Sequence, residues 1–262
     1  IYGTMSKYSE TMAIIKGIRE KTDTAVLFYS AGGKDGIALL EMLATTFKKV
    51  ICYYMYLVND CDHVQPYIDW AEKHYRNVEV RKILHFQHDA FKAGGFFCDP
   101  DPRYLLPKKD PNHLRMRSIG EIEEQVRQET GIPYAFSGMK GVDGYMKRMR
   151  LLMFKKQNGT YMTKKGMVYP LAVWTNGEVL QYIKAKSLIR PLEYVNGKVS
   201  QGLAIDLDHL LFLRKNYPRD YQRCLQEFPY CEKLIFDYEH GIKTKTEMPE
   251  NLQSDDIELE EE

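Results

Sequence analysis

Short apolar runs alternate along the first half of this chain with longer segments in which apolar residues recur every three or four positions. The short runs predict buried strands at residues 24–30, 50–58, 78–84 and 133–137. The longer segments predict helices at about residues 6–21, 37–43, 64–75 and 118–130. Strands that alternate with helices are typical of a parallel sheet, so the pattern predicts an α/β, doubly wound, Rossmann-like fold.

Later regions depart from this alternation. Residues 86–118 are rich in proline, glycine and basic residues. We expect irregular structure there, with a binding loop or lid inserted at 92–118, or a merely solvated connection as the alternative. Beyond residue 203 the pattern becomes helical, and Pro218 is placed to open a new helix. The expected organisation is an α/β domain at 1–195, a helical extension at 196–242 and an acidic, disordered tail at 243–262.

The most informative segment is residues 24–36, where a strand runs into a glycine turn and then directly into an apolar helix. Gly32 and Gly33 form the turn, and Lys34 and Asp35 follow them. A helix N-terminus offers free backbone N–H groups and the positive end of the helix dipole, and glycines let a phosphate approach closely. The segment therefore predicts an anion site, with an ordinary tight turn as the alternative.

The spacing of this segment excludes two common phosphate loops. A Walker A loop requires glycine where Phe28 stands and a hydroxyl residue where Asp35 stands, and the segment lacks the dinucleotide pattern Gly-x-Gly-x-x-Gly. Residues 31–36 instead resemble the PP-loop, Ser-Gly-Gly-x-Asp-Ser, of the ATP pyrophosphatase superfamily. The resemblance implies that the chain binds ATP and cleaves it between the α and β phosphates.

Two positions depart from the PP-loop pattern. Ala31 stands where the first serine is expected, with Ser30 one residue upstream, and Gly36 replaces the last serine. The missing hydroxyl at Gly36 removes one donor to pyrophosphate, a loss of about 1 to 3 kcal/mol. The resemblance implies ATP and Mg²⁺ as cofactors, Lys34 and Asp35 as catalytic residues and Asp35 as the metal ligand. It implies that the nucleotide contacts Ser30, Ala31, Gly32, Gly33, Lys34, Asp35 and Gly36.

The second half of the chain carries two further motifs. Residues 169–183 resemble the Pro-Leu-x-x-Trp-Thr-x-x-Asp-Val-Trp-x-Tyr-Ile signature of phosphoadenosine phosphosulfate (PAPS) reductases and the small subunit of ATP sulfurylase. Residues 138–144 are similar to the Gly-x-Arg-x-x-Glu-Ser segment of the same family. With the PP-loop, the resemblance covers residues 24–195 and implies an adenine nucleotide alpha hydrolase-like fold.

The segment that begins at Gly138 is expected to contribute to the site as well. The resemblance implies that Gly138 contacts the nucleotide and that the basic residues after it bind an anionic substrate. These basic residues are Lys140, Arg148 and Arg150. A solvated helix face is the alternative for them, because neighbouring basic residues on a helix cannot all share one direction.

The adenine is expected at the end of the second strand. Parallel topology should bring this strand end beside the first strand, where ligands bind in open sheets. Tyr56, Leu57 and Val58 are therefore predicted to contact the base. The alternative for Tyr56 is a place in the core.

Composition limits the partners more than it identifies them. The 262 residues carry a net charge of +1, which provides no overall nucleic-acid footprint, so a nucleic-acid partner lacks support from charge. No apolar run approaches the ~20 residues that span a bilayer. The start of the sequence lacks the apolar core of a signal peptide. We expect no membrane association and a cytoplasmic location in a bacterial cell, and the resemblance extends to PAPS reductase-like proteins carried by phages.

The five cysteines fit a reducing compartment. Cys52 lies in an apolar strand and is expected in the core. Cys98, Cys224 and Cys231 with one further ligand leave an iron–sulfur cluster open as an alternative. PAPS reductases carry their reactive thiol in a C-terminal Glu-Cys-Gly-Leu-His segment that this chain lacks, which leaves Cys231 as the late candidate.

Three functions follow from these observations. The first is an enzyme that cleaves ATP between the α and β phosphates and adenylates an acceptor in sulfur metabolism or nucleic-acid modification. The second is PAPS reductase activity with a non-standard or missing thiol. The third is a non-catalytic nucleotide-binding subunit, suggested by Ala31 and Gly36, that acts with a partner protein or as a homodimer.

Overall fold

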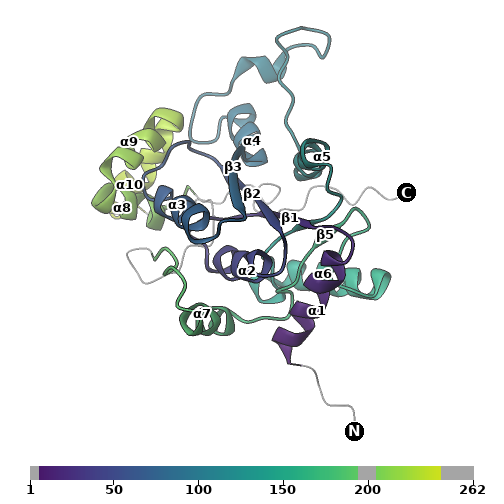
Figure 1. Cartoon of the computed structure of the whole chain (residues 1–262). Coiled ribbons are helices and arrows are strands. Elements are labelled where there is room, and N and C mark those ends of the chain that lie inside the picture. Colours follow the sequence, from purple (N-terminus) through teal and green to yellow (C-terminus); the bar gives the residue numbers. More distant parts are fainter. Residues whose placement is uncertain (1–5, 194–204, 243–262) are drawn as a thin grey trace. The chain divides into compact units, whose positions relative to one another are not determined.

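The computed structural model describes residues 6–193 and 205–242. Five strands form one sheet in the order β3-β2-β1-β4-β5, and helices flank it (Figure 1). The strands are β1 (Thr24–Phe28), β2 (Lys49–Tyr56), β3 (Val78–Leu84), β4 (Ala135–Phe136) and β5 (Met167–Val168). β1 pairs in parallel with β2 and β4, and β4 pairs in parallel with β5. The predicted parallel α/β fold is confirmed.

The helices lie before, between and after these strands. They are α1 (Lys7–Arg19), α2 (Lys34–Ala44), α3 (Gln65–His74), α4 (Phe86–Gly94), α5 (Ile119–Thr130), α6 (Tyr145–Asn158), α7 (Asn176–Ala185), α8 (Leu207–Asn216), α9 (Pro218–Glu227) and α10 (Glu232–Glu239). Three short 3₁₀ turns join them: η1 (Pro102–Leu105), η2 (Gly141–Asp143) and η3 (Pro229–Cys231). Strands and helices predicted in the first half agree with this order to within a few residues at their ends.

Helix α4 was missed, because residues 86–118 were predicted to be irregular throughout. The helix forms because both of its ends are capped. The His85 side chain accepts a hydrogen bond from the backbone N–H of Gln87, and Gly95 ends the helix in the left-handed conformation, at φ 69°. The rest of that stretch is irregular up to Ser118, apart from η1. The proline and glycine content of the stretch predicted no helix, and the residues that indicate one are the caps at its two ends.

Side-chain caps also set the starts of other helices. The Ser6 hydroxyl accepts the N–H of Ser9 at the start of α1. Thr175 and Glu178 form a reciprocal capping box at the start of α7, each side chain accepting the backbone N–H of the other. Because such caps satisfy the first N–H groups of a helix, they set where the chain turns into it.

The described chain divides into two compact units. The first contains residues 6–55, 64–83 and 130–193, and therefore most of the sheet. Its core is formed by β1, β2 and the apolar face of α2, with Val26, Leu27 and Ile37 fully buried. The second contains residues 56–63, 84–129 and 205–242, with α4 and the C-terminal helices. The predicted tail at 243–262 lies outside the described residues.

The second unit has a small core of its own. In it the ring of Phe91 on α4 contacts the ring of Phe228 edge-on, and Lys92 donates to the backbone carbonyl of Glu227. Pro218 occupies the first turn of α9, as predicted. No helix in the described part of the chain is long and apolar enough to cross a membrane.

Candidate functional site

The strand order points to one edge of the first unit. In the sheet, β2 and β3 lie on one side of β1, whereas β4 and β5 lie on its other side. The strand order therefore reverses between β1 and β4. In an open parallel sheet ligands bind at such a switch point, just beyond the carboxyl ends of the two strands. The loop with Gly32 and Gly33 follows β1, and the segment from Ser137 follows β4. The two predicted phosphate-binding segments therefore converge on the same edge.

The loop after β1 has the geometry of an anion cradle. The N–H of Gly33 donates to the carbonyl of Ser30 at 3.2 Å and closes a tight turn. Ala31 lies in the left-handed region, at φ 48°, a conformation that costs a residue with a side chain some strain. Gly33 is the N-cap of α2 and has no side chain to cap the helix. The first-turn N–H groups of α2, from Lys34 onward, are therefore available to an external acceptor.

Ser30 and Gly36 are complementary, which explains one departure from the PP-loop pattern. A side chain at Gly36 would place its Cβ 2.8 Å from the hydroxyl of Ser30, 3.2 Å from the Ser30 backbone nitrogen and 3.2 Å from the Tyr29 ring. A Cβ at Gly33 would lie 2.4 Å from the same hydroxyl. The Ser30 side chain thus occupies the space beside Gly36 where the pattern has a serine. The loop keeps a hydroxyl at this place, supplied from upstream.

A cluster of four charged side chains joins the two segments. The Nζ of Lys140 lies 2.6 Å from Oδ2 of Asp35 and 3.0 Å from Oδ1 of Asp143. The Nζ of Lys34 lies 3.4 Å from the same Asp35 oxygen. Lys140 is 0% exposed, and Lys34 is buried as well. Because a buried ammonium requires carboxylate partners, Asp35 and Asp143 are what permit Lys140 to be charged there.

One oxygen of this cluster lacks a partner. Oδ1 of Asp35 is buried and makes no hydrogen bond to any described residue. Gly138 explains how the segment after β4 comes so near, since a Cβ there would lie 2.9 Å from the Cβ of Asp35. A buried carboxylate oxygen without a donor costs about 1 to 3 kcal/mol. It is therefore a place where a donor or a cation supplied by a ligand would stabilise the protein.

The other predicted residues are placed in different ways. Arg148 is exposed on α6, with its guanidinium 5.8 Å from the centroid of the Tyr145 ring, and Arg150 lies further along the same helix. Tyr56, Leu57 and Val58 belong to the second unit, where Leu57 is buried. Their contact with a nucleotide stays a prediction, as does the substrate role of Lys140, Arg148 and Arg150.

Sequence reasoning did not single out Asp143. Its carboxylate accepts the backbone N–H of Lys140 at 2.8 Å and forms an ion pair with the ammonium of the same residue. This pair closes the 3₁₀ turn η2 and fixes the course of the chain after β4. The available signal was the three-residue spacing between a lysine and an acid, which is that of a helical ion pair.

All five cysteine thiols are buried. Burial raises the pKa of each one, to about 12 for Cys61 and Cys231 and above the ordinary value for Cys52, Cys98 and Cys224. Cys52 lies in the core, as predicted. A buried thiol with a raised pKa is a poor nucleophile, because the thiolate is the reactive form.

The comparisons with known proteins agree with the motifs. The family model described as "Phosphoadenosine phosphosulfate reductase domain" matches residues 24–194, well over half of the chain. A search of curated protein sequences gave no match.

Two solved structures are similar to the chain at 13% identity each. One is a phosphoadenylyl-sulfate (PAPS) reductase from Candida auris in a phosphate complex, with a TM-score of 0.42 over 72% of this chain and 91% of that chain. The other is an NH3-dependent NAD synthetase from Campylobacter jejuni in complex with nitrate, with a TM-score of 0.39 over 92% of this chain and 98% of that chain.

Proposed function

Because this chain belongs to the phosphoadenosine phosphosulfate reductase domain family, we propose that it binds ATP at the loop after β1 and cleaves it to adenylate an acceptor. The observation that carries the proposal is the convergence of Lys34 and Lys140 on Asp35, beside the uncapped start of α2. Two cations and a helix N-terminus at the switch point of a parallel sheet form a site for a polyphosphate.

The reaction needs little covalent chemistry from the protein. An oxygen of the acceptor forms a bond to the α-phosphorus, and the bond from that phosphorus to the bridging oxygen of the β phosphate breaks, so that pyrophosphate leaves. Lys34 and the N–H groups of the loop stabilise the charge that develops on the leaving pyrophosphate. Lys140, held by two carboxylates, keeps Asp35 in a fixed position. Positioning and electrostatic stabilisation account for the rate in this type of transfer.

The residues fit a magnesium ion that arrives with the nucleotide. Oδ1 of Asp35 is a carboxylate oxygen without a hydrogen bond among the described residues, and hard oxygen donors are what Mg²⁺ requires. The two ammonium groups near Oδ2 make the same carboxylate a poor site for a free dication, so phosphate oxygens would have to complete the coordination. When bound, the ion neutralises phosphate charge.

Reductase chemistry fits the chain less well. That reaction uses a cysteine thiolate as nucleophile, and Cys231, the late candidate, is fully buried with its pKa raised to about 12. The other four thiols are buried too. A thiol that stays protonated at neutral pH cannot supply the required nucleophile.

The test is an assay of the purified protein for two products. Pyrophosphate release from Mg-ATP would be measured with sulfate, DNA or tRNA as the acceptor, and sulfite release would be measured with PAPS and a thiol reductant. We expect acceptor-dependent pyrophosphate and no sulfite. Sulfite release that is lost in Cys231→Ser would contradict the proposal and favour the reductase. Nucleotide binding without either product would favour a non-catalytic subunit.

A further inference from the structure

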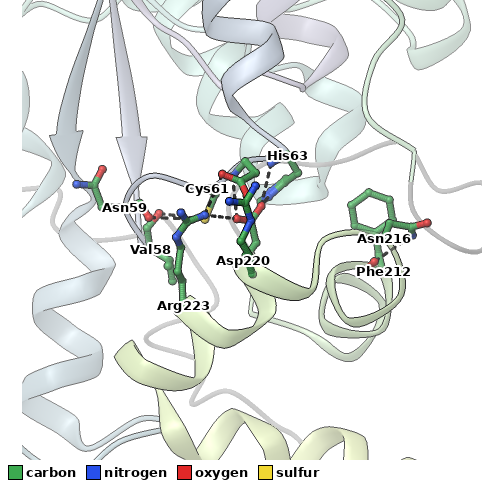
Figure 2. A network of polar contacts seen from close by, with 10 residues as sticks. Val58, Asn59, Cys61, His63, Phe212, Asn216, Asp220 and Arg223 are labelled. Atoms are coloured by element: carbon green, nitrogen blue, oxygen red, sulfur yellow. Dashed lines mark hydrogen bonds and ion pairs between the residues drawn. The ribbon is translucent and has the colours of Figure 1, made fainter.

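Three side chains of different chemistry meet inside the second unit, away from the loop after β1 in the sequence. Cys61 and His63 lie in the segment after β2, and Asp220 lies in the first turn of α9 (Figure 2). All three are buried, and their ligand atoms lie within 4.8 Å of one another. They form the one group of at least three His, Cys, Asp or Glu side chains within such a distance in the described part of the chain.

The two oxygens of Asp220 have different surroundings. Oδ1 accepts hydrogen bonds from the backbone N–H of Asp62 at 2.8 Å and from Nη1 of Arg223 at 2.6 Å. Oδ2 accepts the backbone N–H of His63 at 2.8 Å and faces Nδ1 of the same residue at 2.7 Å. Oδ1 is thus held in place from outside the cluster. The proton between Nδ1 and Oδ2 occupies the place where a metal ion would sit if both atoms were ligands.

The thiol of Cys61 completes this side of the cluster. It donates to the carbonyls of Val58 and Asn59 at 3.5 Å and 3.9 Å (Figure 2). Its sulfur lies within 4.8 Å of the ligand atoms of His63 and Asp220.

We propose that Cys61, His63 and Asp220 bind a Zn²⁺ ion. Sulfur, imidazole and carboxylate donors are the ligand types that bind Zn²⁺ in proteins. Cys61 and His63 come from one segment at a spacing of two residues, and Asp220 comes from α9. On binding, the Cys61 thiol releases its proton, and the imidazole proton moves from Nδ1 to Nε2.

The surroundings of Asp220 supply the outer shell that such a site needs. Ligating carboxylates in proteins are themselves hydrogen-bonded, and Arg223 with the backbone N–H groups of Asp62 and His63 provides these bonds. One thiolate, one carboxylate and Zn²⁺ sum to no net charge, and Arg223 also pairs with Asp62 outside the cluster. The ion would tie the segment after β2 to α9 within the second unit.

The experiment uses the full chain and the metal alone. Protein purified without chelator is analysed for zinc by mass spectrometry, and chelator-treated protein is titrated with Co²⁺ while the thiolate-to-cobalt charge-transfer absorption is recorded. We expect zinc to copurify and the absorption to saturate. Cys61→Ser and His63→Gln should bind Co²⁺ more than about tenfold more weakly. Cys98→Ser, which removes a buried thiol of the same unit outside the cluster, is the matched control and should bind as the wild type does.

The wild-type protein alone can overturn the proposal, even if a variant fails to fold. A folded wild type that retains no zinc and gives no charge-transfer absorption with Co²⁺ would show that Asp220 only anchors the segment by hydrogen bonds. Wild-type Co²⁺ affinity in a folded Cys61→Ser protein would also overturn it. Loss of nucleotide binding has no bearing on this test, because the cluster and the loop after β1 lie in different units.

Discussion

Asp35 and Asp220 are two carboxylates that differ in how many hydrogen bonds their oxygens accept. Each oxygen of Asp220 accepts two hydrogen bonds, and the residue is 0% exposed. Burial raises the pKa of Asp220, but the hydrogen bonds from His63 and from the backbone of Asp62 outweigh it and hold the pKa well below its ordinary value. Asp35 has two ammonium groups near one oxygen and no hydrogen bond to the other among the described residues.

The set of hydrogen-bond donors around Asp220 is complete, whereas the set around Asp35 is incomplete. A carboxylate such as that of Asp220, whose lone pairs all accept hydrogen bonds, is stable without a ligand. A metal ion can bind to it only by replacing the proton of one of these hydrogen bonds. A buried oxygen without a donor is costly until a ligand supplies one. We therefore expect Asp35 to belong to a site that binds and releases its ligand, and Asp220 to belong to a permanent one.

Removing Lys140 should have the largest effect on stability. Lys140→Met leaves Asp35 and Asp143 without their shared ammonium, and breaking a buried ion pair costs about 3 to 5 kcal/mol. Urea denaturation followed by circular dichroism measures the change in the free energy of unfolding. Lys164→Met, at an exposed position of the same unit, is the control. A loss below about 0.5 kcal/mol, as at an ordinary surface site, would show that Lys140 is not held as described.

Asp220→Asn should be the next most damaging change. The amide loses the charge-assisted bonds to Arg223 and His63, and a hydrogen bond to a charged group contributes about 1.5 to 3 kcal/mol. We expect a loss of roughly that size in urea denaturation of the chelator-treated protein. Asp99→Asn, an exposed carboxylate of the same unit, should change the free energy of unfolding little. Equal effects of the two substitutions would remove the contrast between a structural carboxylate and an ordinary one.

The sequence predicted one of these carboxylates and missed the role of the other for a physical reason. The loop after β1 is contiguous from Ser30 to Gly36, so its pattern survives in the sequence alone. The His63 and Asp220 pair joins residues 157 positions apart, and nothing in either segment indicates the other. The Lys140 to Asp35 ion pair required the order of the strands, because β4 reaches its place beside β1 only in the folded sheet.

The fold, too, could be predicted from the sequence only where a local pattern indicated an element. Apolar runs predicted β1 and β2, and β3 was predicted although Val-Glu-Val-Arg-Lys-Ile-Leu mixes apolar with charged residues. β5 is only two residues long, and no strand was predicted there. Helix α4 was missed because it lies in a stretch rich in proline and glycine, and the signals at its ends, His85 and Gly95, are single residues. Short elements of this kind depend on their neighbours, which a local pattern does not contain.

Substitutions at Ser30 test whether its hydroxyl contributes to nucleotide affinity. Ser30→Ala removes the hydroxyl beside Gly36, and the loss of a hydrogen bond to a charged phosphate should weaken nucleotide affinity about tenfold. Gly36→Ser should also weaken it while Ser30 is present, because the two side chains compete for one space. Calorimetric titration with Mg-ATP measures both, with Ser9→Ala on α1 as the control. Wild-type affinity in Ser30→Ala would show that the hydroxyl does not contact the ligand.

The smallest effect is expected from acid titration of the second unit. The hydrogen bond from His88, with that from Lys92, lowers the pKa of Glu227 from 4.5 to about 2. A depressed carboxyl pKa stabilises the folded state above the ordinary value, and this stabilisation is lost as the pH falls from 4.5 towards 2. Glu227→Gln should therefore flatten the dependence of unfolding free energy on pH in that range. An unchanged slope would show that the pair does not persist in solution.

The central claim is that the loop after β1 binds the phosphates of an adenine nucleotide. It is tested most directly by calorimetric titration of Mg-ATP into the wild type, Lys34→Ala, Asp35→Ala and the exposed control Lys164→Ala. The affinity should fall at least about tenfold in the first two variants, since each loses a group at the phosphate site, and should be unchanged in the control. Circular dichroism must show all four proteins folded. Wild-type affinity in both Lys34→Ala and Asp35→Ala would contradict the account.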